Sequence, residues 1–263
     1  MKAYAVAYSI ALQETLQRRW SFLMERVGSF AVVVSLYSFW SALLGDKQDF
    51  LGYTRPEMLT YTLALNFLMS FVFTGRGWLL VGEISSGRVS SYLVRPVSYQ
   101  GYSLALDLAQ KSVHAVSALV EIGLLTLVVG GIFLPRDPAA WLLFAASALA
   151  ASLLFFFLEF CVSTLAFWTS ESGGPLFCFE LFVQFAAGAF FPLDVLPDGL
   201  RRLLEATPLP YMAYYPARIF LGKVPTDEAL RLVGLELAWL LGAFLLAAWA
   251  WRRGVRSYAA EGG

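Results

Sequence analysis

The chain has 263 residues, of which 59% are hydrophobic and 14% are charged, and its mean hydropathy is +0.65. A soluble domain carries about a quarter charged residues, so this composition excludes an ordinary water-soluble domain and indicates an integral membrane protein. The formal net charge is +0, which argues against a nucleic-acid partner.

Residues 1–26 are predicted to form an amphipathic helix that lies in the membrane interface. Apolar side chains recur at every fourth position, away from polar neighbours such as Gln13 and Glu14: Tyr4, Tyr8, Leu12, Leu16 and Trp20. A cleaved secretory signal is not expected, because no clear small-residue cleavage site precedes the charged residues. The same pattern also fits an amphipathic helix that packs on protein, and this alternative stays open.

Six apolar runs follow, and each is expected to cross about 30 Å of hydrocarbon as a helix. They cover approximately residues 27–44, 58–75, 112–134, 141–168, 176–191 and 232–251. The fifth run is short and stops at Pro192, so it is expected to be tilted, broken or re-entrant. The predicted fold class is all-α: a single polytopic membrane domain over residues 1–263, with six transmembrane helices and both termini on one side.

Two segments between these runs are not expected to span the membrane. Residues 76–111 lie on the side of the termini, where Lys and Arg are slightly more frequent, and this excess favours the cytoplasm. Residues 192–231 lie on the opposite side as an outer hairpin, which prolines divide: Pro192, Pro197, Pro208, Pro210, Pro216 and Pro225. A short amphipathic helix is predicted within it over residues 198–205, with three leucines on one face: Leu200, Leu203 and Leu204.

Motifs for catalysis or metal binding are weak. Residues 82–89 carry the two glycines of a P-loop, but Arg88 and Val89 stand where Lys and Ser or Thr are needed. The single histidine, His114, and the two cysteines have no metal-ligand spacing. No catalytic residue, metal or cofactor is therefore predicted on this chain.

Four glutamates fall inside the predicted crossings: Glu121, Glu159, Glu180 and Glu236. An ionised carboxylate at the bilayer centre costs about 2.5–3.5 kcal/mol, so each must face protein or water, be protonated, or lie near an interface. No Lys or Arg is predicted mid-span to pair with them. Two interpretations stay open, namely a cation path or polar patch on a substrate cavity, and hydrogen bonds between helices.

Three short stretches occur in a recognisable order along the chain. The N-terminal helix carries RRW at residues 18–20, and EISSGRV at residues 83–89 leads to LVRP at residues 93–96. FFPL at residues 190–193 then opens the hairpin that prolines divide. In this order, and with six crossings, the chain resembles the permease subunits of type-2 ATP-binding-cassette exporters, particularly their small bacterial members.

The resemblance implies a multi-pass permease of the bacterial cytoplasmic (inner) membrane, with both termini cytoplasmic and membrane lipid around it. It implies a second permease chain, identical or related, and cytoplasmic ABC ATPase subunits that hold ATP and magnesium in place of this chain. In such permeases a short coupling helix in the first cytoplasmic loop sits in a cleft of the ATPase. Here that role would fall on residues of the loop 76–111: Glu83, Gly87, Arg88, Tyr92 and Arg95.

The resemblance also implies that substrate moves between the two permease chains, past the second and fifth crossings. The candidates on that path are Asn66, Glu159, Glu180, Phe182, Phe185, Phe190 and Phe191. The phenylalanines suit an apolar or amphipathic cargo, with ordinary packing as the alternative, and Asn66 also fits a hydrogen bond between helices. Two other functions compete with transport: an intramembrane enzyme that acts on lipid or peptide, and a non-transporting scaffold or channel subunit.

Overall fold

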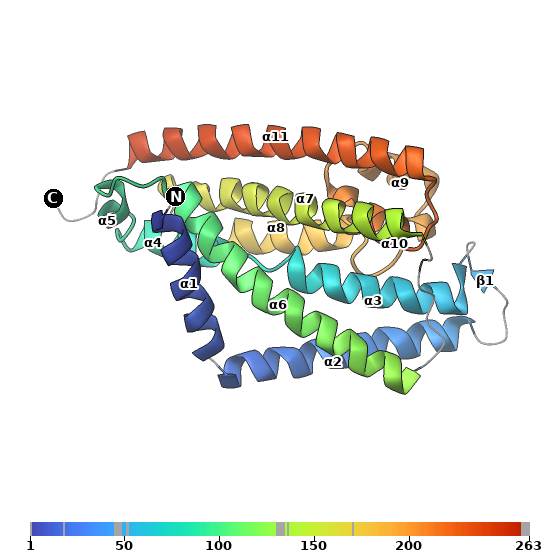
Figure 1. Cartoon of the computed structure of the whole chain (residues 1–263). Helices are drawn as coiled ribbons and strands as arrows, with labels where there is room; N and C mark the ends of the chain where they lie inside the picture. The colour runs from blue at the N-terminus through green and yellow to red at the C-terminus, as the bar shows by residue number, and fades with distance from the viewer. Residues whose placement is uncertain are drawn as a thin grey trace.

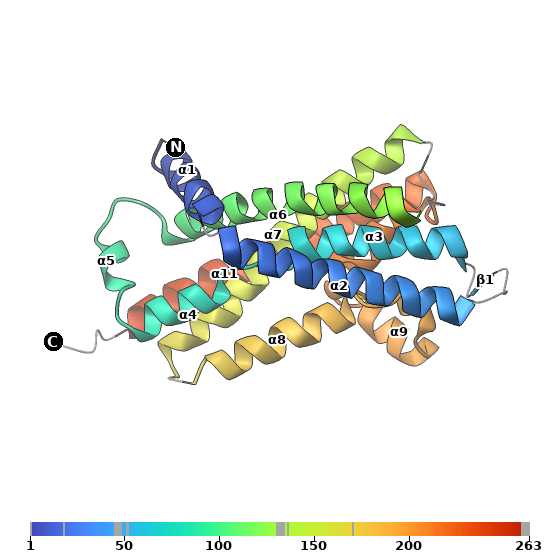
Figure 2. The same ribbon diagram turned by 90° about the horizontal axis from the view of Figure 1, so that it is seen from below.

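A computed structural model describes residues 2–17, 19–44, 49–50, 53–129, 135, 137–169 and 171–258. The main helices run along one common axis and alternate in direction (Figure 1 and Figure 2): α2 (Arg19–Leu44), α3 (Arg55–Phe71), α6 (Tyr99–Val129), α7 (Pro138–Ser163), α8 (Gly173–Ala186) and α11 (Thr226–Ser257). Among the described helices, α2, α6, α11 and α7 with its continuation η1 (Thr164–Phe167) are long and apolar enough to cross a membrane. With 17 and 14 residues, α3 and α8 are shorter than the ~20 residues that a crossing needs.

The bundle has two unlike ends, which both views separate clearly (Figure 1 and Figure 2). The termini end holds the start of α1 (Lys2–Gln17), the end of α11, and the short helices α4 (Gly77–Ser85) and α5 (Ser90–Leu93). The hairpin end holds α9 (Asp198–Glu205), α10 (Tyr214–Phe220) and the antiparallel strand pair β1 (Asp49–Phe50) and β2 (Tyr53–Thr54). Both described ends of the chain therefore lie on one side of the bundle, as the sequence predicts.

The N-terminal segment is divided into two helices rather than being one helix over residues 1–26. Helix α1 packs on α6, where the Tyr8 hydroxyl donates to Ser112 Oγ at 2.9 Å and Ala7 and Ala11 are buried. Residues after Arg18, which itself lies outside the described residues, already belong to α2. Arg26 lies within α2, and its Nη1 donates to Ser70 Oγ of α3 at 3.1 Å. The packing of α1 fits the alternative given for this segment, and its place in a membrane interface stays a prediction.

Helix α6 begins at Tyr99 rather than near residue 112, so most of the predicted loop 76–111 is helical. The segment that hydropathy missed contains a buried ion pair within α6, in which Lys111 Nζ lies 2.9 Å from Asp107 Oδ2 and neither side chain is more than 1% exposed. Lys111 also donates to the Ser152 carbonyl at 3.0 Å. These charges lower the apparent hydropathy of a segment that the fold nevertheless buries. Residues 130–134 of that predicted crossing lie outside the described residues.

The chain turns sharply after α8, which ends at Ala186 rather than near residue 191. Gly188 has φ +77°, and a Cβ there would lie 3.2 Å from the Phe191 carbonyl oxygen and from Leu193. A side chain is therefore disfavoured both by backbone conformation and by space. The turn leads into η2 (Leu193–Val195) and then α9.

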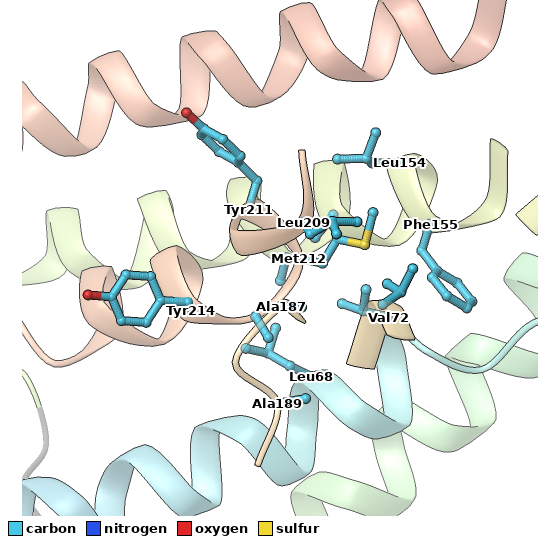
Figure 3. Close-up of a cluster of buried hydrophobic side chains, with 14 of the residues drawn as sticks. Leu68, Val72, Leu154, Phe155, Ala187, Ala189, Leu209, Tyr211, Met212 and Tyr214 are labelled. Carbon is cyan, nitrogen blue, oxygen red and sulfur yellow. The ribbon is translucent and has the colours of Figure 1, made fainter. Parts of the chain in front are cut away.

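Much of the outer hairpin is buried inside the bundle and does not lie over its surface. Met212 at the end of η3 (Leu209–Met212), and Tyr214 and Ala217 of α10, are fully buried. Figure 3 shows Met212 and Tyr214 together with side chains of α3, α7 and the turn after α8, including Leu68, Val72, Leu154, Phe155 and Ala187. The predicted helix over residues 198–205 is confirmed as α9, although only Leu204 of its three leucines is buried.

Candidate functional site

The elbow, defined as residues 83–98, runs from the last turn of α4 to the residue before α6. It is a tight and exposed turn at the termini end. Gly87 has φ +76°, a conformation that glycine adopts without penalty, and it lets α5 follow α4 directly. Val89 is fully buried and anchors the elbow, whereas Val94 is 84% exposed. Pro96 closes the segment because it cannot donate a backbone hydrogen bond. The elbow thus combines one internal anchor with a surface open to a partner.

The five predicted coupling residues divide into outward and inward groups. Arg88 and Arg95 are exposed, and the Arg95 guanidinium lies 5.0 Å from the centroid of the Tyr92 ring. Arg88 Nε donates to Ser86 Oγ at 3.1 Å within the elbow. Glu83 instead turns inward and accepts a short hydrogen bond from the Tyr99 hydroxyl of α6. Gly87 supplies the turn itself, so the residues open to a partner are Arg88, Arg95 and part of Tyr92.

Behind the elbow lies a group of stacked aromatic rings that the sequence analysis did not single out. Tyr99 stacks on Trp251 of α11 with centroids 4.7 Å apart and ring planes within 8°. Trp251 also contacts Phe160 of α7 at 5.5 Å and Phe167 of η1 at 5.4 Å. This aromatic group joins the elbow to α7 and α11. Its rings come from segments far apart in the sequence, so only the three-dimensional packing reveals it.

Glu159 fills the break between α3 and α4. Its side chain is buried, and Oε2 accepts a hydrogen bond from the Arg76 backbone N–H at 3.2 Å, next to the first turn of α4. The carboxyl group occupies space beside Gly75 and Gly77, where a Cβ on either glycine would collide with it. A cavity of about 10 Å³ at this point is lined by Glu159 and Ser103, and that is about enough for one water molecule.

Glu180 of α8 contacts the same helix, since Trp78 Nε1 of α4 donates to Glu180 Oε2 at 3.1 Å. The structure therefore brings Glu159 and Glu180 together on α4, close to the elbow. Both carboxylates serve as acceptors for α4 groups. Glu236 of α11 is also a hydrogen-bond acceptor, but its donor is the Ser147 hydroxyl of α7, at 2.7 Å.

Asn66 and Phe190 lie in a different place, a groove between α2 and α3 with a volume of about 260 Å³. Asn66 is buried, and its Nδ2 donates to Ser29 Oγ of α2 at 3.0 Å and to Glu121 Oε1 of α6 at 3.5 Å. Phe190, from the turn after α8, lines the same groove. Two of the predicted path residues therefore share one cavity.

A cation reaches the intramembrane glutamate Glu121, contrary to the sequence expectation. Arg26 Nη1 lies 3.9 Å from Glu121 Oε2, and Arg26 Nη2 lies 3.0 Å from Glu25 Oε1. His114 Nδ1 lies 3.1 Å from the same Arg26 nitrogen. Hydropathy alone places Arg26 in the N-terminal segment, directly before the first predicted crossing. The relative rotation of α2 and α6, which brings it to Glu121, leaves no signal in a single sequence.

Phe182 and Phe185 point away from this groove, on the outer face of α8. They are 59% and 48% exposed, and Leu181 beside them is 56% exposed. Phe185 contacts Phe191 edge-to-face at 5.2 Å. The predicted path residues therefore fall into three groups: the two acids of α7 and α8 that contact α4, the groove pair Asn66 and Phe190, and the apolar face of α8 with Phe191 beside it.

The hairpin end is held by a polar network around Asp194. Tyr53 and Tyr214 donate to its two carboxylate oxygens at 2.9 and 2.8 Å, and Arg201 lies 3.1 Å from Oδ1. Arg218 in turn donates to the Tyr214 hydroxyl at 2.9 Å. Burial, opposed by Arg218 and reinforced by Asp194, raises the pKa of Tyr214 well above its usual range, so it stays a donor at neutral pH.

A second ion pair fixes this end to the start of α3. Lys223 Nζ lies 2.6 Å from Glu57 Oε1, and Glu57 Oε2 also accepts from the backbone and hydroxyl of Thr54. Burial tends to raise the pKa of Glu57, but the hydrogen bonds from Lys223 and Thr54 outweigh it and lower that pKa below its usual value. Sequence reasoning identified neither this pair nor the Asp194 network, because both join residues from separate loops.

Comparison with protein-family models matches residues 30–262 to the family described as ABC-2 family transporter protein. No curated protein matches the chain. The matched range runs from within α2 to beyond the end of α11, so it includes the elbow, Asn66, Glu159 and the whole hairpin end.

Proposed function

Because the chain belongs to the ABC-2 family of transporter proteins, we propose that it is the membrane-spanning permease subunit of an ATP-binding-cassette exporter. It moves an apolar or amphipathic substrate with energy from separate cytoplasmic ATPase subunits, which hold the ATP and magnesium. The observation that carries the proposal is the elbow: an exposed basic turn, at the end that also holds both chain ends, connected through Tyr99 to the long helices.

In this proposal six helices cross the cytoplasmic membrane of a bacterium, with both termini and the elbow in the cytoplasm. Helices α3 and α8 are too short to cross the membrane alone, and the segments that follow them complete each crossing. Helix α4 extends α3 beyond the break at Glu159, and the buried turn after α8 extends that helix towards the hairpin end. The alternating directions of the six helices support this topology (Figure 2).

Coupling begins at Arg88, Tyr92 and Arg95, which face a polar cleft on the ATPase. Movement of the elbow reaches α6 through the hydrogen bond between Glu83 and Tyr99. It reaches α7 and α11 through the stack of Tyr99 on Trp251. Movement of α4 also reaches α3 at the break between them. There the helical backbone hydrogen bonds are interrupted, and the Glu159 carboxylate accepts the Arg76 N–H instead.

A second permease chain, identical or related, completes the transporter. The exposed apolar face of α8, with Phe182 and Phe185, suits contact with that chain or with lipid. Substrate passes between the two chains, beside α3 and α8, and the groove with Asn66 and Phe190 opens along this route.

Co-purification with the ATPase encoded beside the permease, followed by an ATPase assay, tests this proposal. The double variant Arg88→Ala with Arg95→Ala should lose at least about tenfold in ATPase binding, since removal of each interfacial charge costs about 1 kcal/mol or more. Arg202→Ala with Arg231→Ala, two exposed arginines of α9 and α11 outside the elbow, is the matched control and should bind normally. If both double variants bind the ATPase equally well, the elbow is not the docking site.

A further inference from the structure

Two buried polar atoms in the groove between α2 and α3 have no hydrogen-bond partner within the described part of the chain. They are the acceptor Asn66 Oδ1 and the donor Arg26 Nε. Asn66 is only 6% exposed, and both residues line the groove. Buried polar atoms are nearly always paired in native proteins, because an unpaired one loses its bonds to water without replacement. The two atoms therefore indicate a missing partner that brings both an acceptor and a donor.

Apart from small polar side chains such as Ser29, Thr62 and Ser70, the groove presents mainly apolar surface, and its size suits part of a small ligand. Its volume is about 260 Å³, slightly below the ~300–1,000 Å³ of sites that enclose a drug-sized molecule. Its apolar lining includes Val32, Val33, Leu36, Leu65 and Met69. Val32 is 54% exposed, so the groove opens onto the outer face of α2 and a longer chain can extend from it.

The charges around the groove select against a charged head group. Arg26 already lies 3.0 Å from Glu25 and 3.9 Å from Glu121, so an anion would compete with two carboxylates. A cation at the same place would meet the Arg26 guanidinium itself. A hydroxyl satisfies both free atoms without charge, because it donates one hydrogen bond and accepts others.

We propose that this groove binds a neutral amphiphile whose hydroxyl donates to Asn66 Oδ1 and accepts from Arg26 Nε, while its apolar chain lies along α2 and α3. This inference rests on the proposed function in one respect: the bound amphiphile is the class of molecule that the transporter moves. Binding itself requires neither nucleotide nor the ATPase, so it is measurable on the permease alone.

A pair of matched photoreactive probes tests the proposal on the full chain in phosphatidylcholine nanodiscs. One probe is 1-dodecanol with a diazirine in its chain, and the other is the corresponding alkane without the hydroxyl. Cross-linked peptides are mapped by mass spectrometry. We expect the alcohol to label the segments of α2 and α3 that line the groove about fivefold to tenfold more than the alkane does, as loss of one or two hydrogen bonds predicts.

Two groove variants and one control make the result specific. Asn66→Leu removes the acceptor, and Val32→Trp fills the groove from its exposed side, where the core is not disturbed. Both should reduce the excess labelling by the alcohol to about the level of the alkane. Gln184→Leu, an amide replaced on α8 outside the groove, should leave it unchanged.

The outcomes separate this inference from the proposed function. Equal labelling by both probes, or labelling by the alcohol that survives both groove variants, overturns the binding site even if the ATPase co-purifies. Loss of the excess labelling by the alcohol when two permease chains are assembled would show that a second copy fills the groove, and this also overturns it. Specific labelling of a chain that binds no ATPase would support the groove and contradict the transporter proposal.

Discussion

The two ends of the bundle use the same residue types in opposite ways. At the hairpin end, tyrosines and arginines are directed inward: Tyr53, Tyr214 and Arg201 converge on Asp194, and Arg218 supports Tyr214. At the termini end, Arg88 and Arg95 point outward from the elbow, and one hydrogen bond between Tyr99 and Glu83 attaches α6 to the last turn of α4.

In the proposed exporter, this difference fits a hairpin end that stays fixed and a termini end that receives the ATPase. The hairpin end pairs Asp194 with Arg201 and Glu57 with Lys223. It also places Met212 and Tyr214 in the core (Figure 3). The arginines of the elbow lie at the surface. The elbow is connected to the long helices through Tyr99, which bonds Glu83 and stacks on Trp251. In a transporter driven from the cytoplasm, the first pattern suits a fixed outer closure and the second a docking site.

The largest expected effect is on the buried part of the hairpin end. Met212→Ala removes a fully buried side chain and should lower the free energy of unfolding by about 2–5 kcal/mol, through lost burial and the cavity left behind. Leu203→Ala changes a side chain that is 65% exposed and should stay within about 0.5 kcal/mol. Thermal unfolding of both variants in one detergent checks the contrast, and equal midpoints would show that the hairpin is not part of the core.

A single chemical change, tyrosine to phenylalanine, compares the two ends directly. Tyr214→Phe removes a hydroxyl that bonds Asp194 and Arg218, and should lower the free energy of unfolding by about 1–3 kcal/mol. Tyr215→Phe, one residue further in α10 with its ring against Tyr211, is the matched control and should have little effect. Stability that depends equally on both hydroxyls would weaken the account of the Asp194 network.

At the termini end the same change should affect coupling more than stability. Tyr99→Phe keeps the stack on Trp251 but removes the hydrogen bond to Glu83, so the loss of stability should be about 1 kcal/mol. The ATPase should still bind, whereas transport per ATP hydrolysed should fall several-fold. Transport in proteoliposomes measured beside ATP hydrolysis checks this, and an unchanged ratio would show that the bond carries no coupling.

The smallest expected effect is the response of the hairpin end to acid. The pKa of Glu57 is lower in the folded chain than its usual value of 4.5. The pair with Lys223 therefore stabilises the fold fully at pH values above 4.5. Its contribution is lost as the pH falls through the lowered pKa, and it should be below about 1 kcal/mol because the pair is partly exposed. The difference in unfolding midpoint between the wild type and Glu57→Gln should therefore shrink as the pH falls, and a difference that grows in acid would contradict this sign.

The sequence predicts the helical membrane architecture well, since length and hydropathy are local properties. The predicted bounds of α7 and α9 agree with the structure within a few residues, and those of α11 are slightly short. The sequence also locates the exposed turn between the second and third predicted crossings. It fails at α6, where Asp107 and Lys111 read as loop residues although each neutralises the other inside the bundle.

For the candidate sites, the sequence indicates which residues to consider but not which contacts they make. Glu159 is a candidate as an acid within an apolar run, and Asn66 is one through the family resemblance. Neither signal indicates that Glu159 fills a helix break or that Asn66 shares a groove with Arg26. Glu83 was expected to face a partner, and its inward bond to Tyr99 depends on how α4 crosses α6. Contacts of this kind are set by the rotation and tilt of packed helices, which no local pattern records.

The most direct test of the central claim is the side of the membrane on which the elbow lies. Single cysteines are placed at Val94 in the elbow, which is 84% exposed, and at Gly199 in α9, where a new side chain meets open space, with Cys161 and Cys178 replaced by alanine. A membrane-impermeant maleimide added to intact cells should label the cysteine at position 199, and should label that at position 94 only after the membrane is opened. Labelling of position 94 in intact cells would contradict the account, because an elbow outside the cell cannot meet an ATPase in the cytoplasm.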